Sequence, residues 1–381
     1  MLRRFFAPAA AVCAALAASP ALAGVVNPDI SVIGQPFFRF TDDPNDPDPN
    51  RLRLDVGETE FMFDAALNPY AHGTFVASLG SDGSMSLEEG YFTLLRGLPL
   101  DLQLKGGKYR VGFGKLNPAH PHAYPFADRF RVLAAYLPGD ESLDETGISL
   151  SERLPAPGDM ALTASVDYLQ GDTFRRERAA SGAANDPLAV NPGGHDDAAQ
   201  SRPAVLGRLS AFNMLGDQSA LELGLSALHG TNNVAAAART TVLGADAKAK
   251  LWTSDNAYLV LQGEALKLSR DDAGWDSTAA RYTLTNVNPF GMYVFADFNW
   301  SLRYNAGVSF ETFQEPTGAK PWDHAFGAFA GLALMEETTA FRLDWNRLVA
   351  GSPGSGPAPA AVNTVTLRVI YSMGPHKAHQ F

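Results

Sequence analysis

Two histidines and one aspartate lie close together in the sequence and are of the types that bind metal ions. His120 and His122 flank Pro121, and Asp128 follows a few residues later. Side chains two residues apart in an extended segment point to the same side. Two imidazoles and a carboxylate are typical of an open zinc site, so His120, His122 and Asp128 form one hypothesis for a metal centre with zinc as its cofactor. The alternative is that the histidines only shape a proline-rich loop.

The segments that must position these residues alternate strictly between polar and apolar side chains. Between residues 303 and 313, one face carries Tyr304, Ala306, Val308 and Phe310, and the other carries Arg303, Asn305, Gly307, Ser309 and Glu311. Residues 243–252 and 364–373 show the same pattern. A period of two residues predicts β-strands with one apolar and one polar face.

Sixteen such strands are predicted. They cover residues 30–40, 51–65, 71–80, 85–95, 100–114, 142–154, 160–170, 203–214, 219–230, 239–253, 257–270, 290–299, 303–313, 323–335, 338–349 and 362–373. Tight turns alternate with mostly long connections, a pattern typical of outer-membrane barrels. We therefore expect an all-β fold: a single transmembrane antiparallel barrel of about sixteen strands, with short periplasmic turns and long external loops. A secreted β-sandwich or β-helix would not explain the alternating loop lengths.

The first 23 residues have the features of an export signal. Arg3 and Arg4 precede an alanine-rich apolar run, and Ala21-Leu22-Ala23 before Gly24 resembles a cleavage site. We expect residues 1–23 to be the signal peptide and 24–381 to be the barrel. Cleavage would remove Cys13, the single cysteine, and with it any disulfide framework. No apolar run reaches the ~18 residues of a membrane-spanning helix.

The overall charge and the motifs argue against other functions. The 381 residues carry a formal net charge of -11, so nucleic-acid binding is not expected. Phosphate-binding and dinucleotide-binding fingerprints are absent, and no nucleophile and base are suitably placed, so we expect no enzyme. No cofactor is expected apart from the candidate zinc.

Charged side chains on the polar faces of the strands predict a water-filled bore. The long connection 115–141 has the position of the loop that folds into the bore of many porins, and residues 126–137 are predicted to form a short helix in it. The candidate pore-lining and constriction residues are Lys105, Lys108, Arg110, Asp128, Arg129, Arg131, Asp140, Glu141, Lys248, Lys250, Arg303, Arg342 and Arg368. Acids on the loop facing bases on the wall would select solutes by charge and size. The alternative is an external loop without a role in the pore.

Three short segments carry a family resemblance: Asn27-Pro28-Asp29-Ile30-Ser31, the stretch from Gly114 to His122, and the tail from Gly374 to Phe381. With the strand pattern, they resemble bacterial outer-membrane porins of the sixteen-stranded type, which includes the phosphate-selective porins. They are also similar to porin-like proteins labelled zinc-regulated outer-membrane receptors. This chain shows no plug-sized segment before the first strand, so an energised receptor mechanism is not expected.

The resemblance implies an outer-membrane channel for passive diffusion of small hydrophilic solutes or ions. A zinc-linked uptake or receptor barrel is the alternative, and an outer-membrane enzyme is a weaker one. The implied partners are membrane lipids and lipopolysaccharide, the barrel assembly machinery through Phe381, and further copies of the chain in a homotrimer. A second histidine pair, His376 and His379, should lie on the periplasmic side, away from His120 and His122.

Overall fold

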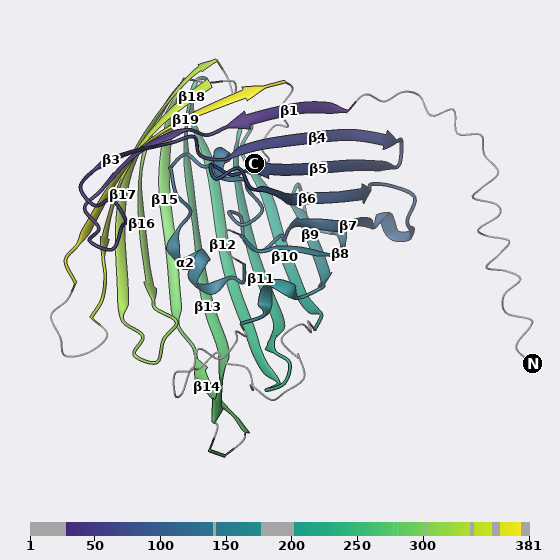
Figure 1. Cartoon of the computed structure of the whole chain (residues 1–381). Coiled ribbons are helices and arrows are strands. Elements are labelled where there is room, and N and C mark those ends of the chain that lie inside the picture. Colours follow the sequence, from purple (N-terminus) through teal and green to yellow (C-terminus); the bar gives the residue numbers. More distant parts are fainter. Residues whose placement is uncertain are drawn as a thin grey trace, which may run out of the picture.

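The computed structural model describes residues 28–139, 142–176, 202–276, 278–279, 281–301, 303–335, 339–352 and 359–374. Its strands form one antiparallel sheet whose first and last strands pair with each other. The sheet is therefore closed, and Figure 1 shows it as a barrel coloured from purple at the N-terminus to yellow at the C-terminus.

The strands run in sequence order around the barrel wall. The first half of the chain contains β1 (Asp29–Gly34), β2 (Phe37–Thr41), β3 (Leu52–Asp55), β4 (Thr59–Asn68), β5 (Ala71–Leu79), β6 (Met85–Leu94), β7 (Gln103–Arg110), β8 (Asp144–Leu154) and β9 (Ala161–Leu169). The second half contains β10 (Ala204–Leu215), β11 (Ser219–Asn233), β12 (Ala238–Ser254), β13 (Ala257–Asp276), β14 (Arg281–Val287), β15 (Phe290–Trp300), β16 (Tyr304–Gln314), β17 (Trp322–Met335), β18 (Thr339–Val349) and β19 (Val362–Met373).

Helical structure is scarce in the described residues. It consists of α2 (Arg131–Tyr136) and the short 3₁₀ turns η1 (Pro99–Asp101), η2 (Pro121–Ala123) and η3 (Asp172–Phe174). None of these helices is long and apolar enough to cross a membrane.

Three barrel strands are each built from two segments that lie end to end. β1 and β2 form one barrel strand, because both pair with β19. β3 and β4 form the next one, because β3 pairs with β2 and β4 pairs with β1. β14 and β15 form the third, because both pair with β13. The nineteen described segments therefore make sixteen barrel strands. The prediction of an all-β antiparallel barrel with sixteen strands is confirmed.

The two faces of the wall differ in polarity, as β15 illustrates. Tyr293, Phe295 and Asp297 are buried on the inside, whereas Met292, Val294 and Phe298 are exposed on the outside. Exposed large apolar side chains recur on most other strands, for example at Leu223 and Leu225 of β11. The outer surface is thus apolar, the reverse of the arrangement in a water-soluble protein and the arrangement that barrels in membranes adopt.

The strand expected at 100–114 ends earlier than the alternation suggests. β7 stops at Arg110, and the amide of Val111 donates to the carbonyl of Leu143 at 2.9 Å. This bond brings the two ends of residues 111–143 together at the wall. The intervening chain folds inside the barrel, where α2 lies against β13, β15 and β16 (Figure 1). The predicted helix at 126–137 is shorter than expected, because only Arg131–Tyr136 are helical.

The connection expected at 271–289 is largely a strand pair. β13 continues to Asp276 and pairs with β14 from Arg270↔Val287 to Asp276↔Arg281. Figure 1 shows this hairpin extending beyond the rim of the barrel. β19 ends at Met373, where the sequence predicted the last strand to end. The signal peptide at 1–23 and the tail with His376, His379 and Phe381 lie outside the described residues.

Gly107 in β7 provides a test of the wall geometry. Its φ is +133°, and a Cβ atom would lie 2.2 Å from the carbonyl oxygen of Gly90 and 2.7 Å from the Cα of Tyr91. Backbone strain of this kind costs about 1–3 kcal/mol even before the clash. We expect Gly107→Ala to unfold at lower urea concentration in detergent micelles than the wild type.

The matched control is Gly207→Ala in β10. No heavy atom lies within 4 Å of a Cβ atom built there, so its unfolding midpoint should stay close to that of the wild type. Equal midpoints for Gly107→Ala and the wild type would contradict the strand pairing around Gly107.

Candidate functional site

The described residues between β7 and β8, 111–139 and 142–143, form a segment inside the barrel that we call the lumen segment. Asn117 holds its two ends together. Its amide nitrogen donates to the carbonyls of Val111 at 2.8 Å and Leu143 at 3.0 Å, and its Oδ1 accepts from the amide of Leu143 at 2.9 Å. Oδ1 also accepts from Arg129 at 2.9 Å. Asn117 is fully buried, so these bonds fix the point at which the chain leaves and rejoins the wall.

Aromatic side chains bind the lumen segment to the inner wall. Phe130 stacks on Tyr293 of β15 with ring centroids 4.1 Å apart, and Phe126 contacts Phe295 and Phe329. The contact cluster extends to α2, where Val132 and Leu133 are fully buried. Inward wall residues are therefore aromatic where Phe126 and Phe130 meet them, and this part of the barrel is packed rather than open.

Buried carboxylates anchor the backbone of the lumen segment. Glu264 of β13 accepts from the amides of Lys115 and Leu116, both at 2.8 Å. Glu311 of β16 accepts from the Arg131 guanidinium at 2.8 Å and from the amide of Val132 at 3.3 Å. The segment is thus tied to β13 near its start and to β16 at the start of α2.

The lumen segment lies between two cavities. The cavity toward the long loops has a volume of about 880 Å³ and is lined by Gly80, Ser81, Ser84, Lys108, Arg110, Asp144 and Asp172, among others. The cavity toward the short turns has a volume of about 710 Å³ and is lined by Lys105, Arg110, His120, His122, Lys248, Asn299 and Arg342, among others. Arg110 borders both cavities.

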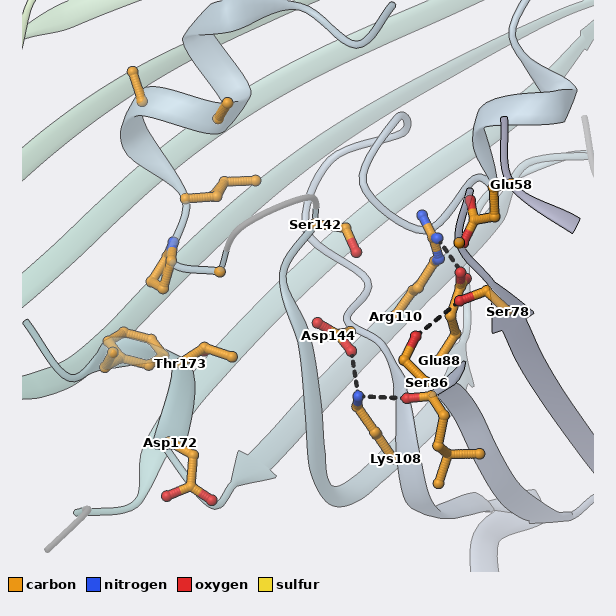
Figure 2. Close-up of a pocket in the computed structure, with 18 of the residues that line it drawn as sticks. Glu58, Ser78, Ser86, Glu88, Lys108, Arg110, Ser142, Asp144, Asp172 and Thr173 are labelled. Atoms are coloured by element: carbon orange, nitrogen blue, oxygen red, sulfur yellow. Dashed lines mark hydrogen bonds and ion pairs between the residues drawn. The ribbon is translucent and has the colours of Figure 1, made fainter. Parts of the chain in front are cut away.

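Figure 2 shows the loop-side cavity and its charged wall. The Nζ atom of Lys108 lies 2.8 Å from Asp144, and Arg110 lies 2.8 Å from Glu88. Glu58 stands beside Glu88, across from the end of the lumen segment at Ser142 (Figure 2). Ion pairs between neighbouring strands therefore line one wall of this cavity.

Five titratable residues gather where the lumen segment meets β4 and β6, and we call them the His–Glu cluster: Glu60, Glu88, Glu89, His120 and His122. The Nδ1 atoms of both histidines lie 3.1 Å from Glu60, His120 from Oε2 and His122 from Oε1. The Nε2 atom of His120 lies 3.4 Å from Glu89, and the two imidazole rings stack with centroids 5.4 Å apart.

The cluster favours positive charge at His120. Burial alone would lower the pKa of this imidazole, but Glu60, Glu88 and Glu89 outweigh burial and hold the pKa well above its ordinary value. The positive charge of Arg110, which contacts Glu88, opposes the increase only in part. The site therefore attracts a cation.

A β-bulge in β6 makes this concentration of carboxylates possible. Val76 of β5 pairs with Glu89 and Ala77 pairs with Leu87, which leaves Glu88 as the extra residue. Consecutive side chains of a regular strand point to opposite faces, but a bulge turns both inward. Both glutamates are buried inside the barrel. Two adjacent charges in a predicted membrane strand are the sequence signal that could have indicated this bulge.

Asp128 lies outside the His–Glu cluster, although the sequence grouped it with His120 and His122. Its carboxylate lies 3.6 Å from Arg39 and 3.6 Å from Arg368. The chain turns away after His122 because Tyr124 and Phe126 are buried in the apolar core. Glu60, which sequence reasoning missed because it is distant along the chain, faces the two histidines instead.

Most of the remaining predicted residues are distributed over three locations. Arg129 and Arg131 belong to the packed interior of the lumen segment, Lys105, Lys248 and Arg342 line the turn-side cavity, and Lys108 lines the loop-side cavity. Lys250 lies over the rings of Trp252 and Tyr258, and Arg303 is exposed in a turn. Asp140 and Glu141 lie outside the described residues.

Sequence comparison gives little information about function. No family model matches the chain. An uncharacterized protein of Aquifex aeolicus (strain VF5) is 29% identical over 273 residues, which cover 68% of this chain and 54% of that protein. The chain thus spans about half the length of this curated relative.

Structural comparison identifies similar barrels. The anion-selective porin from Comamonas acidovorans has a TM-score of 0.59 at 11% identity, with 91% of this chain and 100% of that chain covered. The outer membrane channel DcaP of Acinetobacter baumannii has a TM-score of 0.58 at 9% identity and coverages of 91% and 97%. Salmonella typhi OmpF, in complex with daunomycin, has a TM-score of 0.56 at 11% identity and coverages of 91% and 98%. This chain therefore shares the sixteen-stranded barrel fold of these outer-membrane porins.

Proposed function

We propose that this protein is an outer-membrane channel in which the lumen segment narrows an aqueous bore, so that small hydrophilic solutes cross by passive diffusion. The observation that carries the proposal is the pair of charged cavities on either side of the lumen segment, both bordered by Arg110. Sixteen strands are enough to enclose an aqueous bore, whereas eight strands leave room only for side chains. The segment then acts as a constriction rather than as a plug.

The outer surface supports placement in the outer membrane. Large apolar side chains cover it, and aromatic residues exposed near the strand ends, including Trp300 and Tyr304, have the positions of an interfacial girdle. In this placement, the short turns lie on the periplasmic side of the membrane and the long loops lie on the external side. Residues 1–23 would direct export, and the barrel assembly machinery would recognise Phe381.

Assembly into a homotrimer belongs to the same proposal. A trimer form of OmpT from Vibrio cholerae has a TM-score of 0.55 at 10% identity to this chain, with coverages of 92% and 100%. The surrounding lipids and lipopolysaccharide would contact the rest of the apolar wall. The phosphate-selective and zinc-receptor resemblances concern the solute, which the fold does not specify.

The charges around the turn-side cavity favour anions. The described residues that line it include the basic Lys105, Arg110, Lys115, Arg208, Lys248 and Arg342 and the acidic Glu60, Glu89, Glu222 and Asp297. Lys115 lies 2.6 Å from Glu222, and Asp297 accepts hydrogen bonds from Asn299 and Asn305. The basic excess raises the local concentration of anions at the narrow part of the bore.

The purified protein should form open channels in a planar bilayer without an energy source. The reason is that both cavities are polar and adjoin each other at Arg110. Single-channel conductance measures this directly, with heat-modifiable gel migration as the check that the barrel is folded. A folded barrel that stays silent in the bilayer would rule out the channel proposal.

Deletion of residues 119–137 should raise single-channel conductance severalfold, because it removes α2 and the aromatic residues that fill the bore. The control is deletion of residues 43–49, in the connection between β2 and β3, which should leave conductance near the wild-type value. Equal conductance for both deletions would mean that the lumen segment does not limit the current.

Reversal potentials in a salt gradient should show a preference for anions that Lys248→Glu weakens, because this change reverses one charge on the wall of the turn-side cavity. Arg51→Glu, which makes the same change of charge at an exposed position outside both cavities, is the control and should not shift the potential. A cation preference in the wild-type channel would show that the basic lining does not set selectivity.

A further inference from the structure

We propose that Glu60, His120 and His122 form a binding site for a divalent transition-metal cation such as Zn²⁺ on the wall of the bore. Their candidate ligand atoms all lie within 4.8 Å of one another. The site is independent of whether the barrel conducts, because it rests on the three side chains and their surroundings alone.

The distances between the donor atoms suit tetrahedral coordination. Zinc lies about 2.0–2.2 Å from imidazole nitrogen and carboxylate oxygen, which places neighbouring ligands of a tetrahedron roughly 3.3 Å apart. The Nδ1 atom of His120 lies 3.1 Å from Oε2 of Glu60, and that of His122 lies 3.1 Å from Oε1. Two nitrogen donors and one oxygen donor suit zinc and other first-row divalent metals.

One of the three ligand groups is incompletely satisfied within the protein. The Nδ1 atom of His120 is buried and has no hydrogen bond of good geometry, although it faces the Glu60 carboxylate. A buried nitrogen without a hydrogen bond is costly, and a metal ion between the imidazole and the carboxylate would satisfy both groups.

The surroundings have the form expected around metal ligands. Metal-bound histidines usually direct their other ring nitrogen to a carboxylate or carbonyl, and metal-bound carboxylates usually accept a further hydrogen bond. Nε2 of His120 faces Glu89 at 3.4 Å, and Oε1 of Glu60 accepts from the side chain of Gln35 at 3.2 Å. The backbone around His122 is also fixed, since Arg342 donates to its carbonyl at 2.6 Å.

The net charge of the side chains around the three ligands also favours a cation. With neutral imidazoles, Glu60, Glu88 and Glu89 carry three negative charges against the single positive charge of Arg110, which lies 2.8 Å from Glu88. A divalent cation would offset this deficit. All three ligands line the turn-side cavity, so a further coordination position faces the bore and is accessible to water or a solute.

The test is metal titration of the full-length barrel in detergent, purified without a polyhistidine tag and treated with a chelator. Calorimetry with Zn²⁺ should show one site per chain, and Co²⁺ should produce visible absorption bands typical of four- or five-coordinate nitrogen and oxygen ligands. Glu60→Gln and His122→Ala should each weaken Zn²⁺ binding more than about 100-fold, since loss of an outer partner alone costs about 10- to 100-fold. Glu89→Gln, which removes only the outer partner, should weaken binding less.

Two variants serve as matched controls. His72→Ala removes a histidine that has its own carboxylate partner, Asp64 at 2.9 Å, but lies outside the cluster. Asp128→Asn removes the carboxylate that pairs with Arg39 and Arg368. Both should keep the wild-type affinity, with folding of every variant confirmed by heat-modifiable migration.

Three results would overturn the proposal: a folded wild-type barrel that binds no Zn²⁺, equal affinity in Glu60→Gln, His122→Ala and the wild type, or loss of binding only in the double variant His376→Ala with His379→Ala. In the first of these cases, the cluster holds its positive charge on His120 instead. Because the titration needs no bilayer, its outcome is separate from that of the conductance measurements.

Discussion

The arrangement inside the barrel depends on the hydrogen bonds of one buried side chain, Asn117. Its amide bridges Val111 and Leu143, the residues at which the chain leaves the wall and returns to it. Each of these bonds contributes on the order of 1 kcal/mol, but a buried carbonyl or amide left without a partner would cost about 1–3 kcal/mol. The chain between these residues must therefore start and end at one point of the wall, and its aromatic residues pack it against the inner face.

Two kinds of contact then determine where that chain lies. The Phe130–Tyr293 stack adds about 0.5–1.5 kcal/mol beyond the burial of apolar area, and the neighbouring aromatic contacts extend this packed region. Glu264 and Glu311 hold backbone amides at two separate points, so the segment cannot slide along the wall. This side of the barrel interior is consequently packed, and Arg110, His120 and the lysines face the cavities that remain.

Much of the barrel could be predicted from the sequence, because alternation of polar and apolar residues reports directly on which side of a wall each residue faces. The limits of the sixteen strands agree closely with the prediction, except where the alternation misleads. Val111 and Phe113 continue the alternation of β7 but belong to the lumen segment. The sequence pattern does not distinguish an apolar residue that faces lipid from one that faces a packed interior. The β13–β14 extension was missed because its composition resembles that of a loop.

The site was harder to predict because its residues meet through the closed sheet. His120 and His122 could be picked out by their spacing, but Glu60 lies 62 residues before His122 and only the order of the strands brings them together. Asp128 was nearer in sequence and is nevertheless turned toward Arg39 and Arg368. Glu88 and Glu89 face inward only because of a bulge, which depends on pairing with β5.

The seam between the first and last strands imposes an order on biogenesis. The hydrogen bond between the hydroxyls of Thr41 and Thr364 joins residues 323 positions apart, whereas the other strand pairs form between neighbours along the chain. Contacts between such distant residues form slowly, because the entropy of closing the long loop must be overcome before the contact stabilises anything. Local pairing from β3 to β18 can thus proceed while the sheet is still open, and the lumen segment can pack from the side. Once β19 meets β1 and β2, the segment is enclosed, so its packing against the inner wall must be in place by the time the cylinder is complete.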